Sequence, residues 1–130
     1  MIHHLPSIFV ANSKSKGRGI FTTEKINKGD LIEVCPVIII PPEQFDLIHN
    51  SKLHDYYFLW GEDMKSIAIA LGYGSLYNHQ VNANADFILD LMNDSIDIIC
   101  IEDIEAGNEI TINYHGEAGD EHPLWFDEEE

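Results

Sequence analysis

Residues 71–85 read LGYGSLYNHQVNANA, and this stretch decides how the chain is organised. Gly72 and Gly74 allow backbone conformations and close approaches that side chains disfavour, and the three asparagines that follow tolerate the left-handed region. Apolar side chains such as Leu76 interrupt the polar ones, a pattern that favours a loop anchored on the core with its amides directed at a ligand. Asn78 and His79 lie at the centre of the stretch, so we expect a binding site there.

Length and composition predict one domain over residues 1–130, because 45% of the 130 residues are hydrophobic, with an acidic C-terminal tail over about residues 116–130. No apolar run is long enough to cross a bilayer, and the first residues do not resemble a signal peptide. We therefore expect an intracellular protein, in the cytoplasm or, in a eukaryotic host, in the nucleus. Cys35 and Cys100 lie in strand-like apolar runs, which favours buried thiols over a disulfide.

The excess of acidic over basic residues indicates which partners the protein can bind. Seven basic residues stand against 23 acidic ones, giving a formal net charge of −16. A field of this sign repels nucleic acid and anionic membranes and attracts cationic partners, so we expect a basic protein or peptide substrate, with no direct nucleic-acid or membrane binding. The alternative is that the acidic residues only keep the protein soluble.

Alternating and apolar runs predict a mainly β chain with several short strands and one short helix. Residues 7–11 are expected to form a first strand, followed by a polar loop at 12–17. Residues 31–40 read as a buried strand that ends at Pro41 and Pro42, where a short helix begins. Residues 66–71 predict another strand, and residues 86–92 and 95–101 predict a hairpin joined by a two-residue turn at Asn93 and Asp94.

Two turns share one sequence pattern, Glu-x-Ile-x-x-Gly-x-x-Ile, at residues 24–32 and 102–110. In each, we expect the first isoleucine to be covered, the glycine to take the positive φ of a tight turn, and the last isoleucine to begin a strand. Nothing else recurs at this spacing, so the similarity is local and does not indicate a repeated domain.

The histidines show no spacing that is typical of a metal site. His49 and His54 are five residues apart, which on a helix rotates the two side chains away from each other, and no third ligand is near them in the sequence. We therefore predict no metal centre.

Three segments resemble signatures of the SET domain family. Residues 78–84, NHQVNAN, resemble Asn-His-Ser-x-x-Pro-Asn; residues 109–114, EITINY, resemble Glu-[Leu/Ile]-Thr-x-x-Tyr; and residues 16–21, KGRGIF, resemble Gly-x-Gly-[Ile/Val]-Phe. The segments occur in the family's order and frame nearly the whole chain, which makes the resemblance specific. It is strongest to small viral-type or bacterial-type stand-alone members, because two cysteines exclude the cysteine-rich zinc clusters of larger ones.

This resemblance implies a fold and an activity. SET domains are S-adenosylmethionine-dependent protein lysine methyltransferases with a β-clip-like fold, in which several small sheets and a short helix surround a knot-like crossing of the C-terminal strand beneath a loop. The resemblance therefore implies methylation of lysine side chains on a basic protein, histone-like or other, by a monomer or a homodimer.

The matching positions imply roles for single residues. Tyr114 corresponds to the catalytic tyrosine of the family. The implied cofactor-binding residues are Lys16, Gly17, Arg18, Asn78, His79, Tyr114 and a late aromatic residue, Trp125 or Phe126, that would cover the adenine. Tyr56, Tyr73 and Tyr77 are implied candidates for the lysine channel. From the residues alone, a loop cap is the better account of Asn78, and a ring packed at the end of a strand is the better account of Tyr114.

Some positions depart from the family pattern. Gln80 stands where serine is usual, Ala83 where proline is usual, and His115 where an acidic residue or glycine is common. The loss of proline loosens the loop that would bind the cofactor. The alternative function is therefore a catalytically degenerate SET-like module that holds a basic protein partner on its acidic surface.

Overall fold

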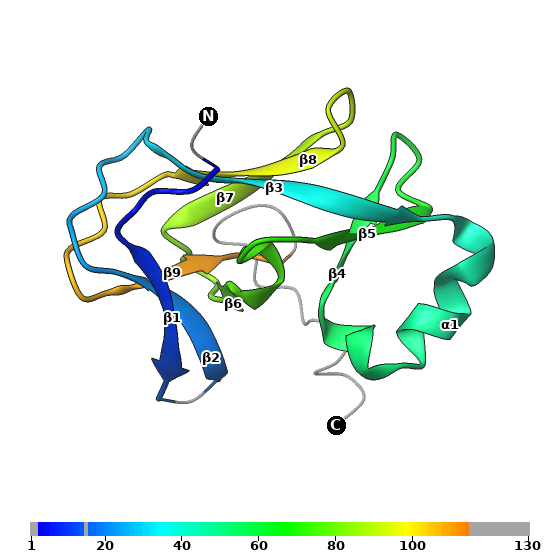
Figure 1. Cartoon of the computed structure of the whole chain (residues 1–130), viewed down its shortest axis with the longest axis horizontal. Helices are drawn as coiled ribbons and strands as arrows, with labels where there is room; N and C mark the ends of the chain where they lie inside the picture. Colours follow the sequence, from blue (N-terminus) through cyan, green and yellow to red (C-terminus); the bar gives the residue numbers. More distant parts are fainter. Residues whose placement is uncertain (1–2, 15, 115–130) are drawn as a thin grey trace.

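The computed structural model describes residues 3–14 and 16–114, which form two β-sheets with short helical segments between the strands (Figure 1). In chain order the strands are β1 (Ile8–Ser13), β2 (Gly17–Thr22), β3 (Leu31–Ile40), β4 (Tyr57–Trp60), β5 (Ser66–Ala70), β6 (Asn78–His79), β7 (Ala85–Asp90), β8 (Ser95–Cys100) and β9 (Glu109–Ile112). The helical segments are η1 (Pro42–Gln44), α1 (Phe45–His49), η2 (Lys52–Asp55) and η3 (Gly74–Leu76). The prediction of a mainly β fold with small sheets and a short helix is confirmed.

The larger sheet has the strand order β4-β5-β3-β8-β7 and is antiparallel throughout. Its long strand β3 crosses most of the molecule in Figure 1 and changes partner along its length. The first part, up to Pro36, pairs with β8, and the part from Val37 onwards pairs with β5. Pro36 lacks a backbone N–H, which suits the point where one ladder ends and the next begins. The sheet is in effect two small sheets that share β3.

The smaller sheet has the order β1-β2-β9-β6. The β1–β2 hairpin is longer than the sequence predicted: Asn12 pairs with Arg18 and Ser13 with Gly17, so residues 12, 13 and 17 of the expected loop belong to strands. In contrast, β6 runs parallel to β9, with Asn78 opposite Thr111 and His79 opposite Ile112. This parallel pairing places the centre of the 71–85 stretch beside the end of β9.

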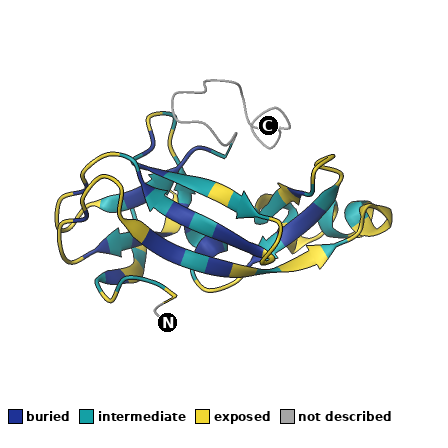
Figure 2. Cartoon of the chain, turned by 90° about the horizontal axis from the view of Figure 1, so that it is seen from above, coloured by how far each residue is buried: buried dark blue, intermediate teal, exposed yellow. Residues whose placement is uncertain are grey.

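The two turns with the shared pattern pack against each other. Ile26 and Ile104 are both buried and exchange backbone hydrogen bonds of 2.9 and 2.8 Å. The glycine of each turn has a positive φ, 95° at Gly29 and 86° at Gly107. The first isoleucines and the glycines are as expected, and each following strand begins one residue before the last isoleucine, at Leu31 and Glu109. Ile26 and Ile104 belong to a core that consists mostly of isoleucine. Figure 2 shows that buried residues run along the strands.

The β7–β8 hairpin is present, but its turn differs from the prediction. The last pair is Asp90 with Ser95, so four residues connect the strands where two were expected. The carboxylate of Asp90 accepts hydrogen bonds from the backbone and side-chain nitrogens of Asn93, at 3.2 and 2.8 Å. Asp94 takes a φ of 50°. The aspartate caps a wider loop, and this local bonding outweighs the preference of the Asn-Asp pair for a tight turn.

The two histidines near α1 lie closer together than predicted. Helix α1 ends at His49 and η2 begins at Lys52, so no continuous helix separates His49 from His54. Their ring centroids are 4.3 Å apart, and the Nδ1 atom of His54 lies 2.6 Å from the His49 carbonyl oxygen. Within residues 3–14 and 16–114 there is no cluster of three or more His, Cys, Asp or Glu side chains that would hold a metal ion.

Three further expectations concern membranes, cysteines and the C-terminus. None of the helices within the described ranges has the length and apolar character needed to cross a membrane. Cys35 and Cys100 are both buried free thiols, as predicted. The acidic tail, Trp125 and Phe126 fall in 115–130, outside the described residues, so the predictions for them stay predictions, as does the knot-like crossing.

Candidate active site

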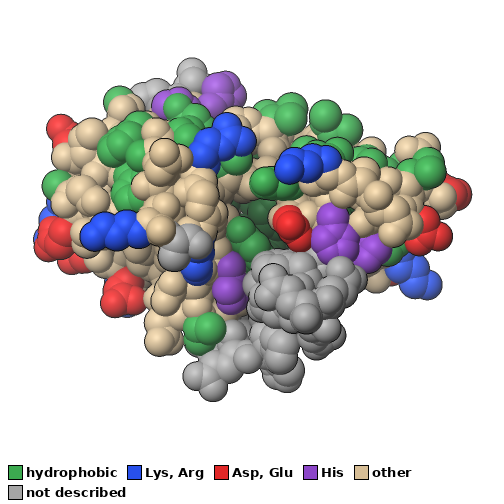
Figure 3. Space-filling model, turned by 90° about the horizontal axis from the view of Figure 1, so that it is seen from below, with side chains coloured by type: hydrophobic (Ala, Val, Ile, Leu, Met, Phe, Trp, Pro, Cys, Tyr) green, Lys and Arg blue, Asp and Glu red, His purple; other side chains and the backbone are tan. Residues whose placement is uncertain are grey.

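A cavity of about 450 Å³ opens on the face shown in Figure 3, where basic, acidic and histidine side chains surround a hollow. Four segments that are distant in the sequence form its walls: the β1–β2 turn with the start of β2, the end of η2, the stretch from η3 to β6, and Tyr114, which follows β9. The lining residues are Lys16, Gly17, Arg18, Asp55, Tyr56, Ser75, Leu76, Asn78, His79 and Tyr114. Most of the residues singled out from the three sequence segments therefore meet in one place.

The β1–β2 turn supplies the positive charge of the cavity. Gly17 has a φ of 76°, which lets β2 begin directly after the turn. The side-chain amine of Lys16 donates a hydrogen bond to the backbone carbonyl of His79, which joins the β1–β2 turn to β6. Arg18 follows on β2, so two cations border the same wall. This wall suits an anionic group such as a carboxylate.

Asn78 is held in one orientation by two acceptors. Its Nδ2 atom donates to the Arg18 carbonyl at 3.1 Å and to the Glu109 carboxylate at 2.7 Å. These contacts fix which end of the amide carries oxygen, because the nitrogen must face both acceptors. The Oδ1 atom accepts no hydrogen bond from residues 3–14 or 16–114. Asn78 thus presents an acceptor that suits a ligand amine.

Gly19 makes room for this arrangement. A Cβ atom at Gly19 would overlap the carboxylate of Glu109 and lie 2.7 Å from Asn78 Nδ2. Only glycine allows β2 to pass this close to both groups. Glu109 had no expected role from the sequence, although it opens the second signature segment. The available signal was a charged residue at the start of a short strand whose alternate residues are isoleucines.

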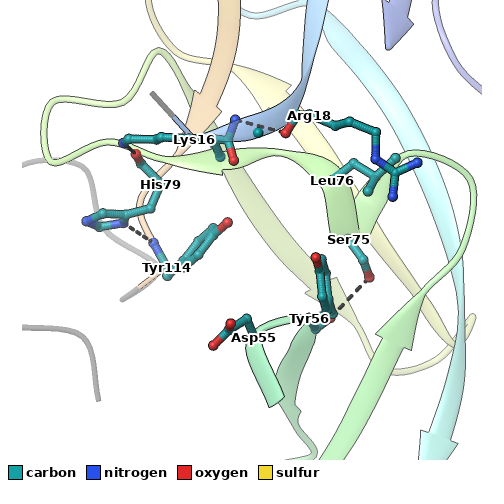
Figure 4. Close-up of a pocket in the computed structure, with 10 residues that line it drawn as sticks. Lys16, Arg18, Asp55, Tyr56, Ser75, Leu76, His79 and Tyr114 are labelled. Atoms are coloured by element: carbon teal, nitrogen blue, oxygen red, sulfur yellow. Dashed lines mark hydrogen bonds between the residues drawn. The ribbon is translucent and has the colours of Figure 1, made fainter. Parts of the chain in front are cut away.

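Tyr114 faces the cavity just beyond the end of β9. Its hydroxyl donates to the backbone carbonyl of Tyr77 at 2.8 Å, and its backbone N–H donates to His79 Nδ1 at 3.1 Å (Figure 4). Burial raises the pKa of the Tyr114 hydroxyl to about 12, with further contributions from the negative charge of Asp55 and from Tyr56 and Glu109. The phenol therefore stays protonated, and its oxygen is fixed in the cavity.

The opposite wall comes from the end of η2 and from η3. In Figure 4, Tyr56 and Tyr114 point into the same space. The hydroxyl of Ser75 donates to the carbonyls of Tyr56, at 3.1 Å, and Ala70, at 2.9 Å, which ties η3 to this wall. Asp55 adds an acidic group. Ser75 and Leu76 had no expected role in the site from the sequence, since only the tertiary structure brings the end of η2 next to η3.

The structure does not bring every predicted site residue to this cavity. Tyr77 is 1% exposed, and its hydroxyl donates to Glu33 Oε1 at 2.7 Å, away from the lining. The ring of Tyr73 lies against His4, with centroids 5.3 Å apart. Neither tyrosine lines the cavity, whereas Tyr56 does. Tyr77 reaches the site through its carbonyl oxygen, which a pattern of side chains does not reveal.

Comparisons with known proteins agree with this geometry. The model of the SET domain family matches residues 17–115. A histone-lysine N-methyltransferase of Schizosaccharomyces pombe (strain 972 / ATCC 24843), described as H3 lysine-37 specific, is 31% identical over 121 residues, which cover 92% of this chain and 77% of the relative. A solved structure of a candidate histone methyltransferase from Plasmodium falciparum superimposes with a TM-score of 0.65 and 27% identity, over 92% of this chain and 96% of that one.

The family match covers both motif-bearing walls of the cavity, from Gly17 on the β1–β2 turn to Tyr114 after β9. The similarity to the yeast relative extends over nearly the whole chain. The chain therefore belongs to the SET domain family of protein lysine methyltransferases.

Proposed function

We propose that this protein transfers a methyl group from S-adenosylmethionine to the side-chain amine of a lysine in a basic protein substrate. One observation carries the proposal: the protonated Tyr114 hydroxyl is fixed in the cavity by the Tyr77 carbonyl, one residue before Asn78. This hydroxyl and carbonyl oxygen support a reaction point beside them, at which an incoming amine and a methyl donor would be held in line.

The polar groups of the cavity fit the cofactor. The Oδ1 atom of Asn78 suits the ammonium of its methionine part, and Lys16 and Arg18 suit the carboxylate. The His79 backbone would meet the adenine edge. When bound, S-adenosylmethionine supplies an activated methyl group on a positively charged sulfur. The carbonyl oxygen of Tyr77 would favour such a methyl through weak C–H···O contacts.

The residues around the cavity would also prepare the lysine. Free lysine has a pKa of about 10.4, so its amine must lose a proton before its nitrogen can form a bond to carbon. Burial between the side chains of Tyr56, Leu76 and Tyr114 favours the neutral amine. In the proposed reaction the amine would release its proton to water before transfer. S-adenosylmethionine would supply the methyl group, and the electron pair of its carbon–sulfur bond would stay on sulfur as the nitrogen–carbon bond forms. The role of these rings and of Leu76 is to align the amine and exclude water.

The substrate class follows from charge and from the relative. The chain carries a net charge of −16, and Asp55 is an acidic group in the cavity wall. The yeast relative is described as specific for a histone H3 lysine. We therefore propose a histone-like basic protein as substrate, met inside the cell by a monomer or a homodimer of this protein.

Calorimetric titration with S-adenosylmethionine tests the proposal without a known substrate. We expect saturable binding by the wild-type protein, binding abolished in Asn78→Ala, and unchanged binding in Asn93→Ala, an exposed asparagine of the β7–β8 loop. Methyl transfer to core histones would then be measured with Tyr114→Phe as the activity control. A folded wild-type protein that binds basic peptides but not the cofactor would show the degenerate binding module instead, to which the substitutions at Gln80 and Ala83 point.

A further inference from the structure

Glu33 is a buried acid outside the cavity. It lies on β3, is 2% exposed, and stands in an apolar strand. Burying a carboxylate is costly unless hydrogen bonds satisfy it. Two do so here: the hydroxyl of Tyr77 donates to Oε1 at 2.7 Å, and the backbone N–H of Tyr73 donates to Oε2 at 2.9 Å. A buried polar group whose hydrogen bonds are satisfied makes the segments that it joins more rigid.

Both contacts fall on the segment that leads into β6. Tyr73 begins this segment and Tyr77 ends it, with η3 between them. Gly72, just before Tyr73, has a φ of 65°, and a Cβ atom there would overlap the Glu33 carboxylate. The carboxylate therefore ties the two ends of η3 together, and η3 carries Ser75 and Leu76 into the cavity wall.

Tyr77 connects this buried contact to the reaction site. Its side chain binds Glu33, and its own carbonyl oxygen accepts the hydrogen bond of the Tyr114 hydroxyl. Burial and the negative charge of Glu33 raise the pKa of the Tyr77 hydroxyl well above its ordinary value, so it stays a donor to the carboxylate. A shift of the Tyr77 side chain would move the same residue's carbonyl, and with it the acceptor that orients Tyr114.

We propose that Glu33 is a positioning residue for the methyl transfer proposed above: through Tyr77 it sets the place of the carbonyl oxygen that holds the Tyr114 hydroxyl. The cofactor site depends on it less. Asn78 is fixed independently by Arg18 and Glu109 and by the pairing of β6 with β9. Loss of the Glu33 contact should therefore slow the chemical step more than it weakens cofactor binding.

Four variants test this inference. Tyr77→Phe removes the hydroxyl and keeps the ring, and Glu33→Ala removes the acceptor. Glu33→Gln keeps both contacts, because the amide oxygen accepts from Tyr73 while the amide nitrogen donates to the Tyr77 hydroxyl oxygen. Thr22→Val is the matched control: Thr22 is also buried and its hydroxyl is hydrogen-bonded, to Ser7 and Glu24, but among the described residues it has no hydrogen bond to η3 and does not line the cavity.

We expect kcat to fall about tenfold to a hundredfold in Tyr77→Phe and Glu33→Ala, since small misplacements near a reacting centre have effects of this size. The Kd for S-adenosylmethionine should change much less, and Glu33→Gln should recover most of the rate. Wild-type kcat in Tyr77→Phe, an equal loss in Thr22→Val, or no recovery in Glu33→Gln would overturn the inference. If Glu33→Ala does not fold, Tyr77→Phe decides alone.

A second measurement separates this inference from the proposed function. Amide hydrogen exchange across residues 71–79 should be faster in Tyr77→Phe than in wild type and unchanged in Thr22→Val. If the wild-type protein transfers no methyl group, the proposed function fails, while exchange still reports whether Glu33 holds the segment. Unchanged exchange in Tyr77→Phe would show that it does not.

Discussion

At the scale of single residues, the site depends on small groups with fixed hydrogen-bond partners. Asn78 presents its oxygen to the cavity because its nitrogen faces two acceptors, and Gly19 leaves the space that this requires. Tyr114 keeps its proton because burial disfavours the phenolate. Each of these contacts depends on a few atoms of one residue, so a single substitution can test it.

Gly19→Ala should weaken cofactor binding at least about tenfold, which corresponds to about 1.4 kcal/mol. The added methyl group would overlap the Glu109 carboxylate and force Asn78 out of its orientation. Calorimetric titration with S-adenosylmethionine measures the effect. Asn12→Ala, at an exposed position of the same hairpin, is the control and should bind like the wild type. Equal affinities for all three proteins would contradict the role given to Gly19.

Alkaline pH should destabilise the protein partly through Tyr114. Its pKa is about 12 in the folded chain, against an ordinary value of 10.0, so between these two pH values the folded state holds a proton that the unfolded state has lost. The free energy of unfolding must therefore fall as pH rises above about 10. Urea unfolding at pH 9 and pH 11 measures this fall, and we expect it to be smaller in Tyr114→Phe. An identical fall in that variant would exclude the contribution.

At the scale of secondary-structure elements, the parallel contact of β6 with β9 brings Asn78 and His79 to the cavity. The pairing is only two residues long. Asn84 reinforces it from the side: its Nδ2 atom donates to the Glu109 carbonyl at 2.9 Å, and its Oδ1 atom accepts from the Thr111 N–H at 2.9 Å. The amide of Asn84 thus replaces a missing strand neighbour along β9.

Asn84→Ala should lower the free energy of unfolding by about 2 kcal/mol, because two hydrogen bonds to strand backbone are lost at about 1 kcal/mol each. Asn82→Ala removes an exposed asparagine of the same loop and should leave stability within about 0.5 kcal/mol of the wild type. Chemical denaturation of the three proteins gives the comparison. A loss in Asn84→Ala no greater than that in Asn82→Ala would show that β9 does not need this clamp.

At the scale of the whole molecule, the net charge bears on the proposed basic substrate. The net charge of −16 attracts a basic protein from a distance, and salt screens such attraction over about 8 Å at physiological ionic strength. We expect the KM for a histone-like substrate to rise several-fold between about 50 and 300 mM salt, with little change in kcat. A KM independent of salt would mean that the acidic surface serves solubility alone.

The sequence alone determined the family, the mainly β fold and most of the cavity. The family signatures can be read from short stretches of sequence, at residues 78–84, 109–114 and 16–21. The turns at Gly29 and Gly107 could also be predicted, because glycine readily adopts the positive φ that they require. The β7–β8 turn is wider than predicted because the Asp90 carboxylate accepts two hydrogen bonds from Asn93. The prediction considered only the preference of Asn93 and Asp94 for a two-residue turn.

Only the tertiary structure decided which groups meet. It pairs β6 with β9 in parallel, joins Asp55 to the cavity, and directs the Tyr77 ring inward to Glu33, 44 residues away in sequence. A tyrosine in a loop that mixes polar and apolar residues can either line a channel or make a buried hydrogen bond. The neighbouring sequence does not distinguish these two positions of its side chain. The buried carboxylate on β3 decides between them, since Glu33 needs a donor and only the folded chain brings one within reach.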